Sequence, residues 1–208
     1  MSPKRTLYYI ADPMCSWCWG FNPVLEVVSS LLPDRIPIRY VMGGLARDSQ
    51  EPIDDETRAY IQSQWRNVAE RTGASFNWDF WDSCVPKRST YPACRAVIAA
   101  GMQRTNADFE MFQAIQRAYY VEARNPAEID TLLQISREIK LDPGQFSIDL
   151  IADHTDTLLH KDFELRRSLE ANKFPTMILE YNENIFWLAY GYEKEEVVVD
   201  LLNSALLS

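Results

Sequence analysis

The chain has 208 residues, of which 47% are hydrophobic and 25% charged, with a formal net charge of −9. This composition excludes a globally disordered chain and fits one domain, or a core domain with a sizeable insertion. Spread acidic charge argues against a nucleic-acid partner, and the longest apolar runs are too short for a membrane span or a signal peptide, so we expect a cytoplasmic protein.

The first 44 residues read as strand, helix, strand. Thr6 to Ala11 is rich in β-forming residues and ends at Asp12-Pro13, a turn signal. A helix is predicted from Cys15 or Ser16 to Leu32, although Pro23 should end its first turn or kink it. A second strand is predicted from Ile36 to Met42, closed by a turn at Gly43-Gly44. The crossover is long enough for the two strands to be parallel.

From Asp54 to about Asn172 the pattern is helical. Asp54 or Asp55 can cap a first helix that stops at Gly73. Pro92 suits the first turn of the next helix, and Asn106 can cap another. Further helices are predicted around the apolar positions 129 to 139, after Asp142-Pro143, and from about Asp153.

The last segment returns to β character. Thr176 to Glu180 and Ile185 to Ala189 flank a hairpin turn at 181–184, and a helix is predicted from Glu193 to Leu207. The order βαβ, helices, ββα predicts an α/β fold with one mixed sheet and an inserted all-helical domain. We place the sheet domain at 1–50 and 173–208 and the insertion at 51–172.

Cys15 and Cys18 form a Cys-x-x-Cys pair directly after a strand and at the start of a helix. Unpaired backbone N–H groups and the helix dipole favour a thiolate at the first position, and thiolate is the attacking species in disulfide exchange. We therefore expect Cys15 to be the nucleophile and the more exposed thiol, and Cys18 to resolve the mixed disulfide. The alternatives are buried inert thiols or half of a zinc site. The other potential ligands do not have the usual zinc spacings; they are Cys84, Cys94, His154 and His160.

The segment Asp12-Pro-Met-Cys-Ser-Trp-Cys-Trp-Gly-Phe21 resembles the active-site segment of DsbA-family thioredoxin-fold oxidoreductases, in particular the cytoplasmic DsbA-like or FrnE-like branch. Lys173-Phe-Pro-Thr-Met-Ile178 resembles the proline loop of that family, and Ser89 to Ala96 resembles a helix start in its helical insertion. The resemblance implies a thioredoxin fold, a redox-active dithiol without a bound metal or cofactor, and a cis peptide bond before Pro175. It also implies a loop at Phe174 and Pro175 that binds substrate beside the dithiol.

For other residues near the motif, the sequence predicts a position or leaves two roles open. Trp17 is expected at the surface, where it can bind substrate, whereas Trp19 and Phe21 are expected to pack the helix onto the sheet. Asp12 can assist proton transfer to Cys18 or simply form the turn. Cys84 and Cys94 can form a second disulfide or stay unpaired, and unpaired cysteines are the more common case in a cytosolic protein.

The leading functional hypothesis is a thiol–disulfide oxidoreductase that exchanges disulfides with protein substrates or small thiols such as glutathione. One alternative is a glutathione-dependent enzyme of the kappa-class transferase or chromene-carboxylate isomerase type. Those enzymes typically have Ser where this chain has Cys15. A second alternative is a non-catalytic module that binds client proteins. The sequence leaves open the direction of exchange, the substrate and the oligomeric state.

Overall fold

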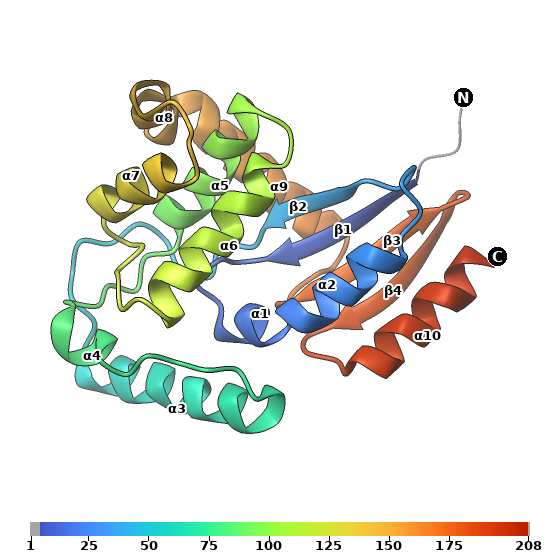
Figure 1. Ribbon diagram of the computed structural model, residues 1–208, viewed down its shortest axis with the longest axis horizontal. Coiled ribbons are helices and arrows are strands. Elements are labelled where there is room, and N and C mark those ends of the chain that lie inside the picture. The colour runs from blue at the N-terminus through green and yellow to red at the C-terminus, as the bar shows by residue number, and fades with distance from the viewer. Residues whose placement is uncertain (1–4, 208) are drawn as a thin grey trace.

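A computed structural model describes residues 5–207 and contains one four-stranded mixed sheet (Figure 1). The strands are β1 (Arg5–Ala11), β2 (Ile38–Met42), β3 (Thr176–Tyr181) and β4 (Asn184–Tyr190), in the order β2-β1-β3-β4. β1 pairs with β2 in parallel, and the β1–β3 and β3–β4 pairs are antiparallel. These pairings confirm the predicted α/β class and mixed sheet.

The strand ends follow local chemistry. β2 begins two residues later than predicted, because Pro37 has no N–H to contribute to the ladder. The β3–β4 turn has positive φ values at Asn182 (49°) and Glu183 (67°). Positive φ at both central residues is the hallmark of the type I′ turn that favours a two-residue hairpin.

The single helix predicted from Cys15 to Leu32 is two helices, α1 (Ser16–Gly20) and α2 (Asn22–Leu31). Pro23 occupies the first turn of α2, where its missing N–H costs no hydrogen bond, and the helical stretch is interrupted at Phe21. The consequence is a very short helix after Cys15. Its macrodipole is correspondingly small, so nearby N–H groups matter more for this sulfur than helix length does.

Along the part of the chain that the structure describes, seven helices separate β2 from β3, and an eighth follows β4. They are α3 (Asp55–Thr72), α4 (Phe80–Ser83), α5 (Tyr91–Gln103), α6 (Ala107–Tyr120), α7 (Ile129–Glu138), α8 (Pro143–Leu150), α9 (Asp153–Ser168) and finally α10 (Glu195–Leu206). The Asp54 side chain accepts the Thr57 N–H, and Asp142 accepts those of Gly144 and Gln145, as expected for N-caps. We call residues 55–168 the helical segment.

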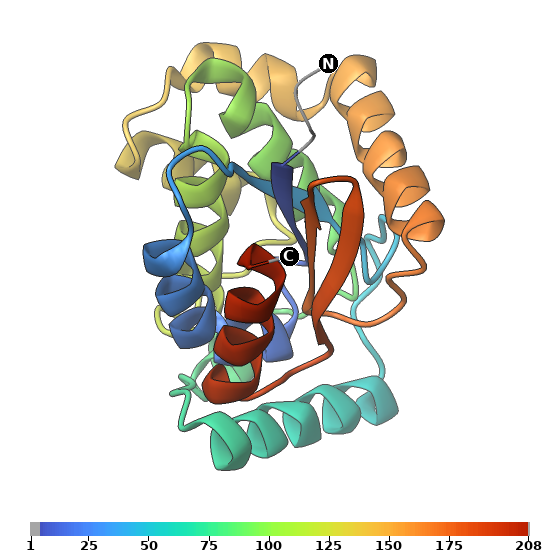
Figure 2. The same cartoon turned by 90° about the vertical axis from the view of Figure 1, so that its right-hand side faces the viewer.

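Both faces of the sheet are covered. α2 and α10 lie on one face and α9 on the other (Figures 1 and 2). The main core is continuous between the sheet and the helical segment, and the ring of Tyr9 on β1 lies 6.0 Å from that of Phe112 on α6. The two parts thus share buried apolar surface, and their division into separate domains stays a prediction.

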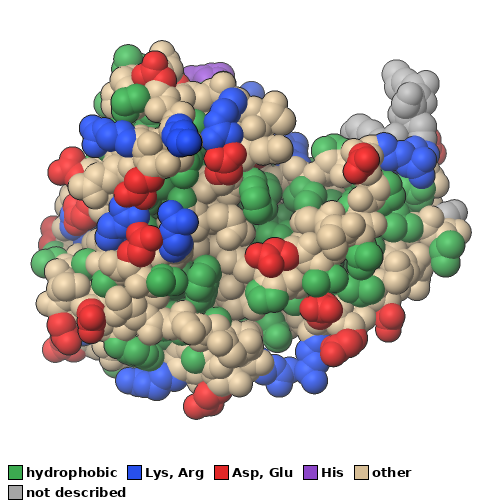
Figure 3. Space-filling view, in the orientation of Figure 1, with side chains coloured by type: hydrophobic (Ala, Val, Ile, Leu, Met, Phe, Trp, Pro, Cys, Tyr) green, Lys and Arg blue, Asp and Glu red, His purple; other side chains and the backbone are tan. Residues whose placement is uncertain are grey.

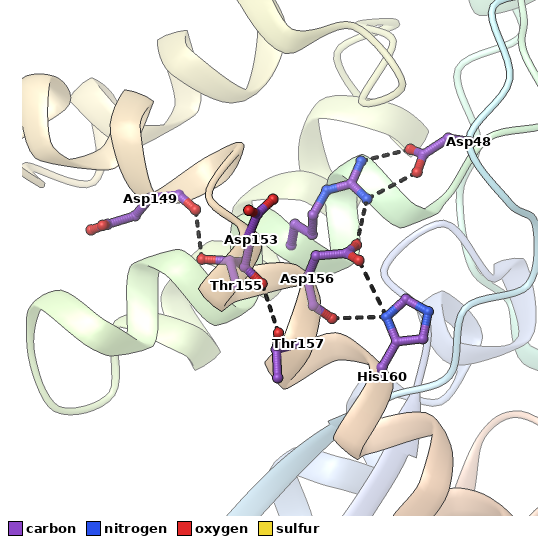
Figure 4. Close-up of polar contacts among 8 residues, drawn as sticks. Asp48, Asp149, Asp153, Thr155, Asp156, Thr157 and His160 are labelled. Atoms are coloured by element: carbon purple, nitrogen blue, oxygen red, sulfur yellow. Dashed lines mark hydrogen bonds and ion pairs between the residues drawn. The ribbon is translucent and has the colours of Figure 1, made fainter.

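Arg95 on α5 fixes the loop that follows β2. Its guanidinium donates to both carboxylate oxygens of Asp48 at 2.6 and 2.9 Å and to Asp156 of α9 at 3.3 Å. Asp156 also contacts His160, one turn along α9 (Figure 4). A bidentate, largely buried arginine is a firm anchor, so the segment just before Asp48 is held against α5.

Candidate active site

Cys15 and Cys18 lie 3.6 Å apart at the start of α1. Cys15 is the N-cap residue, with extended backbone angles, and its N–H donates to the carbonyl of Asp12 at 3.0 Å. Cys15 is 7% exposed and Cys18 is fully buried, which confirms their predicted order of exposure. The nucleophile candidate sits at the bottom of a pocket, however, and not on an open turn.

The surroundings of the Cys18 sulfur disfavour a negative charge. Burial raises the pKa of the Cys18 thiol well above its usual range, the neighbouring Cys15 adds to this rise, and contact with the backbone of Asp12 opposes it. Cys18 is therefore a protonated thiol at neutral pH. A buried thiol that must lose its proton before it attacks suits a resolving cysteine.

The proline loop faces the dithiol. The Phe174–Pro175 peptide bond is cis, as predicted, and the Cys15 sulfur lies 4.0 Å from the Phe174 carbonyl oxygen. The Pro175 carbonyl accepts the Gly191 N–H at 2.8 Å, which joins this loop to the end of β4. A Cβ at Gly43 would lie 2.5 Å from the Phe174 ring, so the turn after β2 can approach this loop only as glycine.

Two hollows share Trp17 and Phe174 as lining residues, and Cys15 lines only the first. The first, of about 280 Å³, contains Cys15 and is walled by α3, by the loop after β2 and by the segment before α5. The second is an open groove of about 840 Å³ between α3, Lys173 and the β4–α10 connection. We call them the thiol pocket and the outer groove. The lining residues of the thiol pocket used below are Tyr60, Gln64, Lys87, Arg88, Thr90 and Phe174.

The aromatic residues of the motif differ from the prediction in which of them are exposed and which pack on the sheet. Trp17 is half-buried, and its Nε1 donates to Gln64 at 3.3 Å, because α3 passes over α1. Phe21 is fully buried in the main core, as expected. Trp19 does not pack on the sheet: its ring stacks on Tyr120 of α6 and its Nε1 donates to the Ser75 carbonyl. The helical segment therefore supplies the apolar surface that covers Trp19, and the sequence pattern did not predict this contact.

Asp12 has a larger role than a turn. Its carboxylate is fully buried and accepts hydrogen bonds from the N–H groups of Met14 (2.8 Å) and Leu45 (2.7 Å) and from the Thr90 hydroxyl (2.7 Å). The Cys94 thiol donates a weaker one at 3.6 Å. Asp12 thus joins the dithiol loop, the loop after β2 and α5.

Cys84 and Cys94 do not form the disulfide considered above. Cys84 donates to the Ala123 carbonyl at 3.1 Å, while Cys94 is buried against Asp12. His154 and His160 are exposed on α9, as expected. Within residues 5–207 no group of three or more His, Cys, Asp or Glu side chains is arranged to hold a metal ion.

Sequence reasoning missed several residues that shape the site. Tyr60 and Gln64 reach the thiol pocket only because α3 folds over α1, and their spacing in the sequence looks like any amphipathic helix. Thr90 lies within the Ser89–Ala96 motif and Arg88 directly before it. That motif was the one available signal that this helix start lies near the dithiol.

Charge on the surface is mixed in sign. Acidic and basic side chains are interspersed on the face shown in Figure 3, without a basic patch. No helix among residues 5–207 has the length and apolar character needed to cross a bilayer.

Known proteins are similar to this chain over almost its whole length. A family model described as thioredoxin matches residues 8–199. A candidate protein disulfide isomerase of Nitrosomonas europaea is 28% identical and superposes with a TM-score of 0.87 over 98% of both chains. The cytosolic disulfide reductase DsbM of Pseudomonas aeruginosa is 27% identical, with a TM-score of 0.80 over 98% of this chain and 100% of that one.

Other relatives, found among curated proteins, are named as adapter proteins and not as disulfide oxidoreductases. The ClpXP adapter protein SpxH of Bacillus subtilis is 25% identical over 183 residues, which are 84% of this chain and 58% of the relative. This chain therefore spans less than two thirds of the curated proteins it matches. The match to the family model over residues 8–199 establishes that the chain belongs to the thioredoxin family, and its Cys15/Cys18 pair has Cys-x-x-Cys spacing.

Proposed function

We propose that this protein is a cytoplasmic thiol–disulfide oxidoreductase that uses Cys15 as nucleophile and Cys18 as resolving thiol. The observation that carries the proposal is the asymmetry of the pair: Cys15 opens into a pocket beside Phe174, while Cys18 is buried 3.6 Å away. Cys15 thiolate attacks one sulfur of a substrate disulfide, and the other leaves as a thiolate. Cys18 loses its proton and displaces the second substrate sulfur, which leaves the substrate reduced and a Cys15–Cys18 disulfide in the protein.

We assign the reductive direction on the strength of the relative named as a cytosolic disulfide reductase, which is also described with GSH. On this proposal a small thiol such as glutathione returns two electrons to the Cys15–Cys18 disulfide and is itself oxidised. The net reaction transfers electrons from two molecules of thiol to a substrate disulfide. Phe174, Pro175 and Trp17 are proposed to position that substrate, since Phe174 and Trp17 line the thiol pocket together with Cys15, and Pro175 follows Phe174 through a cis peptide bond.

The test is to trap the intermediate. In Cys18→Ala, attack by Cys15 should stop at the mixed disulfide, because the resolving thiol is gone. Mass spectrometry of the protein after incubation with a disulfide should show one substrate thiol attached at Cys15. Cys84→Ala is the matched control, since that thiol lies outside the site and its loss should leave no trapped adduct. Failure of Cys18→Ala to accumulate an adduct would reject the mechanism.

The thiol pocket also suggests a preference among substrates. Its charged lining residues are Lys87 and Arg88, in a chain with a net charge of −9. Lys87 is paired with Glu128, but Arg88 is exposed and forms no hydrogen bond or ion pair with other residues of the described chain. An unpaired guanidinium beside the reactive sulfur favours a disulfide that bears carboxylates.

We expect Arg88→Gln to lower the rate constant for reaction with oxidised glutathione about fivefold, and to leave the rate with uncharged hydroxyethyl disulfide unchanged. Arg71→Gln is the control, because Arg71 is also exposed and unpaired within residues 5–207 but lines the outer groove. Stopped-flow measurement at low salt compares the wild type and the two variants with each disulfide. Equal losses for both disulfides, or for both arginine variants, would contradict this preference.

A second candidate function is the binding of client proteins without turnover. The curated relatives named as adapter proteins favour it, and the open outer groove gives a polypeptide room to lie beside Trp17 and Phe174. The glutathione-transferase alternative has weaker support. The chromene-carboxylate isomerase structure that superposes on this chain is only 13% identical, and its likeness shows the fold alone.

A further inference from the structure

The two edge strands of the sheet, β2 and β4, differ in how well they are protected. β2 has five residues, one of them Arg39, and packs against α9. The Met42 N–H donates to the Asp162 carboxylate of α9 at 2.9 Å, and Arg39 donates to the same carboxylate at 3.2 Å. A short strand that carries a charge and is covered by a helix does not readily pair with a further strand, so the β2 edge is closed.

β4, at the other edge, is open. It pairs with β3 on one side and with no other strand of residues 5–207 (Figure 1). Its seven residues, Asn-Ile-Phe-Trp-Leu-Ala-Tyr, include no charged residue and no proline. A register shift against β3 leaves Leu188 without a partner, so residues 184–187 form the regular part of the strand. An uncharged edge strand has a row of backbone N–H and C=O groups that can pair with another strand.

One face of β4 is apolar and uncovered. Ile185, Trp187 and Tyr190 are 48%, 40% and 40% exposed, and the ring centroids of Trp187 and Tyr190 lie 5.5 Å apart. Trp187 lies opposite Ile178 of β3, which is buried in a cluster that also contains residues of α9. The sheet face that α9 covers is therefore apolar as far as the β4 edge, and a strand added at that edge would help to bury these side chains.

The charges at the two ends of β4 have opposite signs. Glu183 directly precedes the strand and is exposed. Lys173 is also exposed and lies beside the other end of the strand, with its Nζ 4.9 Å from the centre of the Tyr190 ring. When two such strands pair antiparallel, Lys173 of each copy approaches Glu183 of the other, whereas parallel pairing brings like charges together.

We propose that β4 pairs antiparallel, edge to edge, with β4 of a second copy of this chain, and that a two-fold axis relates the copies. Two four-stranded sheets then form one continuous sheet, and Ile185 and Trp187 of both copies pack across the junction. The self-complementary charges favour a second copy over an unrelated extended peptide. The inference goes beyond the proposed function and does not involve the dithiol, so Cys15→Ser should dimerise as the wild type does.

Sedimentation equilibrium of the reduced protein measures this association. The interface is small, so the wild type should pass from the mass of one chain to that of two as its concentration rises through the micromolar range. Ile185→Lys places a charge on the strand and should raise the dissociation constant about tenfold or more. Ile148→Lys is the matched control, because Ile148 is 62% exposed on α8, and it should leave the constant within about twofold.

Two results of this measurement would overturn the proposal. One is a wild-type protein that stays monomeric throughout the concentration range, including one that instead binds an extended peptide along β4. The other is an Ile185→Lys protein that dimerises as tightly as Ile148→Lys, since the copies would then meet at another surface.

A charge exchange tests the antiparallel direction. Lys173→Glu and Glu183→Lys each bring like charges together across the junction, and each should weaken the dimer about threefold at low salt. The double variant exchanges the two charges and should recover the wild-type dissociation constant. If the double variant is no tighter than the single variants, the antiparallel arrangement is wrong.

Hydrogen exchange locates the contact. Amide protons in residues 184–187 should exchange more slowly as the protein concentration rises, because pairing with the second copy removes them from water. Those of β2 should exchange at a rate independent of concentration, since that edge is covered by α9. Concentration-dependent protection at another surface, with β4 unchanged, would contradict the proposal. A dimer with this pattern in a protein that exchanges no disulfides would leave the inference standing and reject only the proposed function.

Discussion

Cys15→Ser is expected to lower the rate of disulfide exchange by about a thousandfold or more, because a serine hydroxyl is not ionised at neutral pH and is a poor nucleophile toward sulfur. The protein should stay folded, since the exchange of sulfur for oxygen is small and Cys15 is 7% exposed at the edge of the core. Reduction of a fluorescent protein disulfide, with glutathione as the electron donor, gives the rate. The thermal midpoint checks the fold.

The same variant separates enzyme from adapter. If the main role is client binding in the outer groove, Cys15→Ser should bind a partner with wild-type affinity, because the groove is lined by Trp17, Lys173 and Tyr190 but not by Cys15. If the main role is catalysis, turnover disappears and Cys18→Ala captures the substrate. A Cys15→Ser protein that retains full exchange activity would exclude the proposed mechanism altogether.

Trp65→Ala is expected to cost about 3–5 kcal/mol of unfolding free energy. Trp65 on α3 is 1% exposed and belongs to a hydrophobic cluster beside the main core, whose other buried members are Phe80, Trp81, Tyr119 and Tyr120. Its ring centroid lies 4.9 to 5.8 Å from those of its aromatic neighbours, which are Phe76, Trp78, Phe80, Trp81, Tyr119 and Tyr120. Its removal leaves a large cavity between α3, α4 and α6.

Urea denaturation measures this loss, and Trp78→Ala, which removes one of the rings that contact Trp65, is the control. Trp78 is 40% exposed, so its truncation should cost less than about 1 kcal/mol. A second consequence of Trp65→Ala is functional. Because α3 walls the thiol pocket with Tyr60 and Gln64, loosening this helix should expose Cys15 and speed its alkylation. Equal stability of the two variants would show that α3 is held by other contacts.

Local signals in the sequence were reliable wherever the deciding contacts are local. The caps Asp54 and Asp142 bond to N–H groups two or three residues away, and the stop at Gly73 needs only its own positive φ of 75°. The order of strands and helices predicted the mixed sheet because few topologies connect βαβ to ββα. The Cys-x-x-Cys spacing directly after a strand supplied the candidate thiols, and the resemblance to DsbA-family proteins supplied the cis proline.

What the sequence by itself determined, then, is the set of elements and the pair of candidate thiols. Only the tertiary structure placed Trp19 on Tyr120, separated Cys84 from Cys94, and set Thr90 and Cys94 against Asp12, 78 and 82 residues away along the chain. The physical reason is that periodicity and turn chemistry report which face of an element is apolar, not which partner covers it. That choice depends on how the helical segment packs over the sheet, and it decides the burial, and hence the proton affinity, of every group around the dithiol.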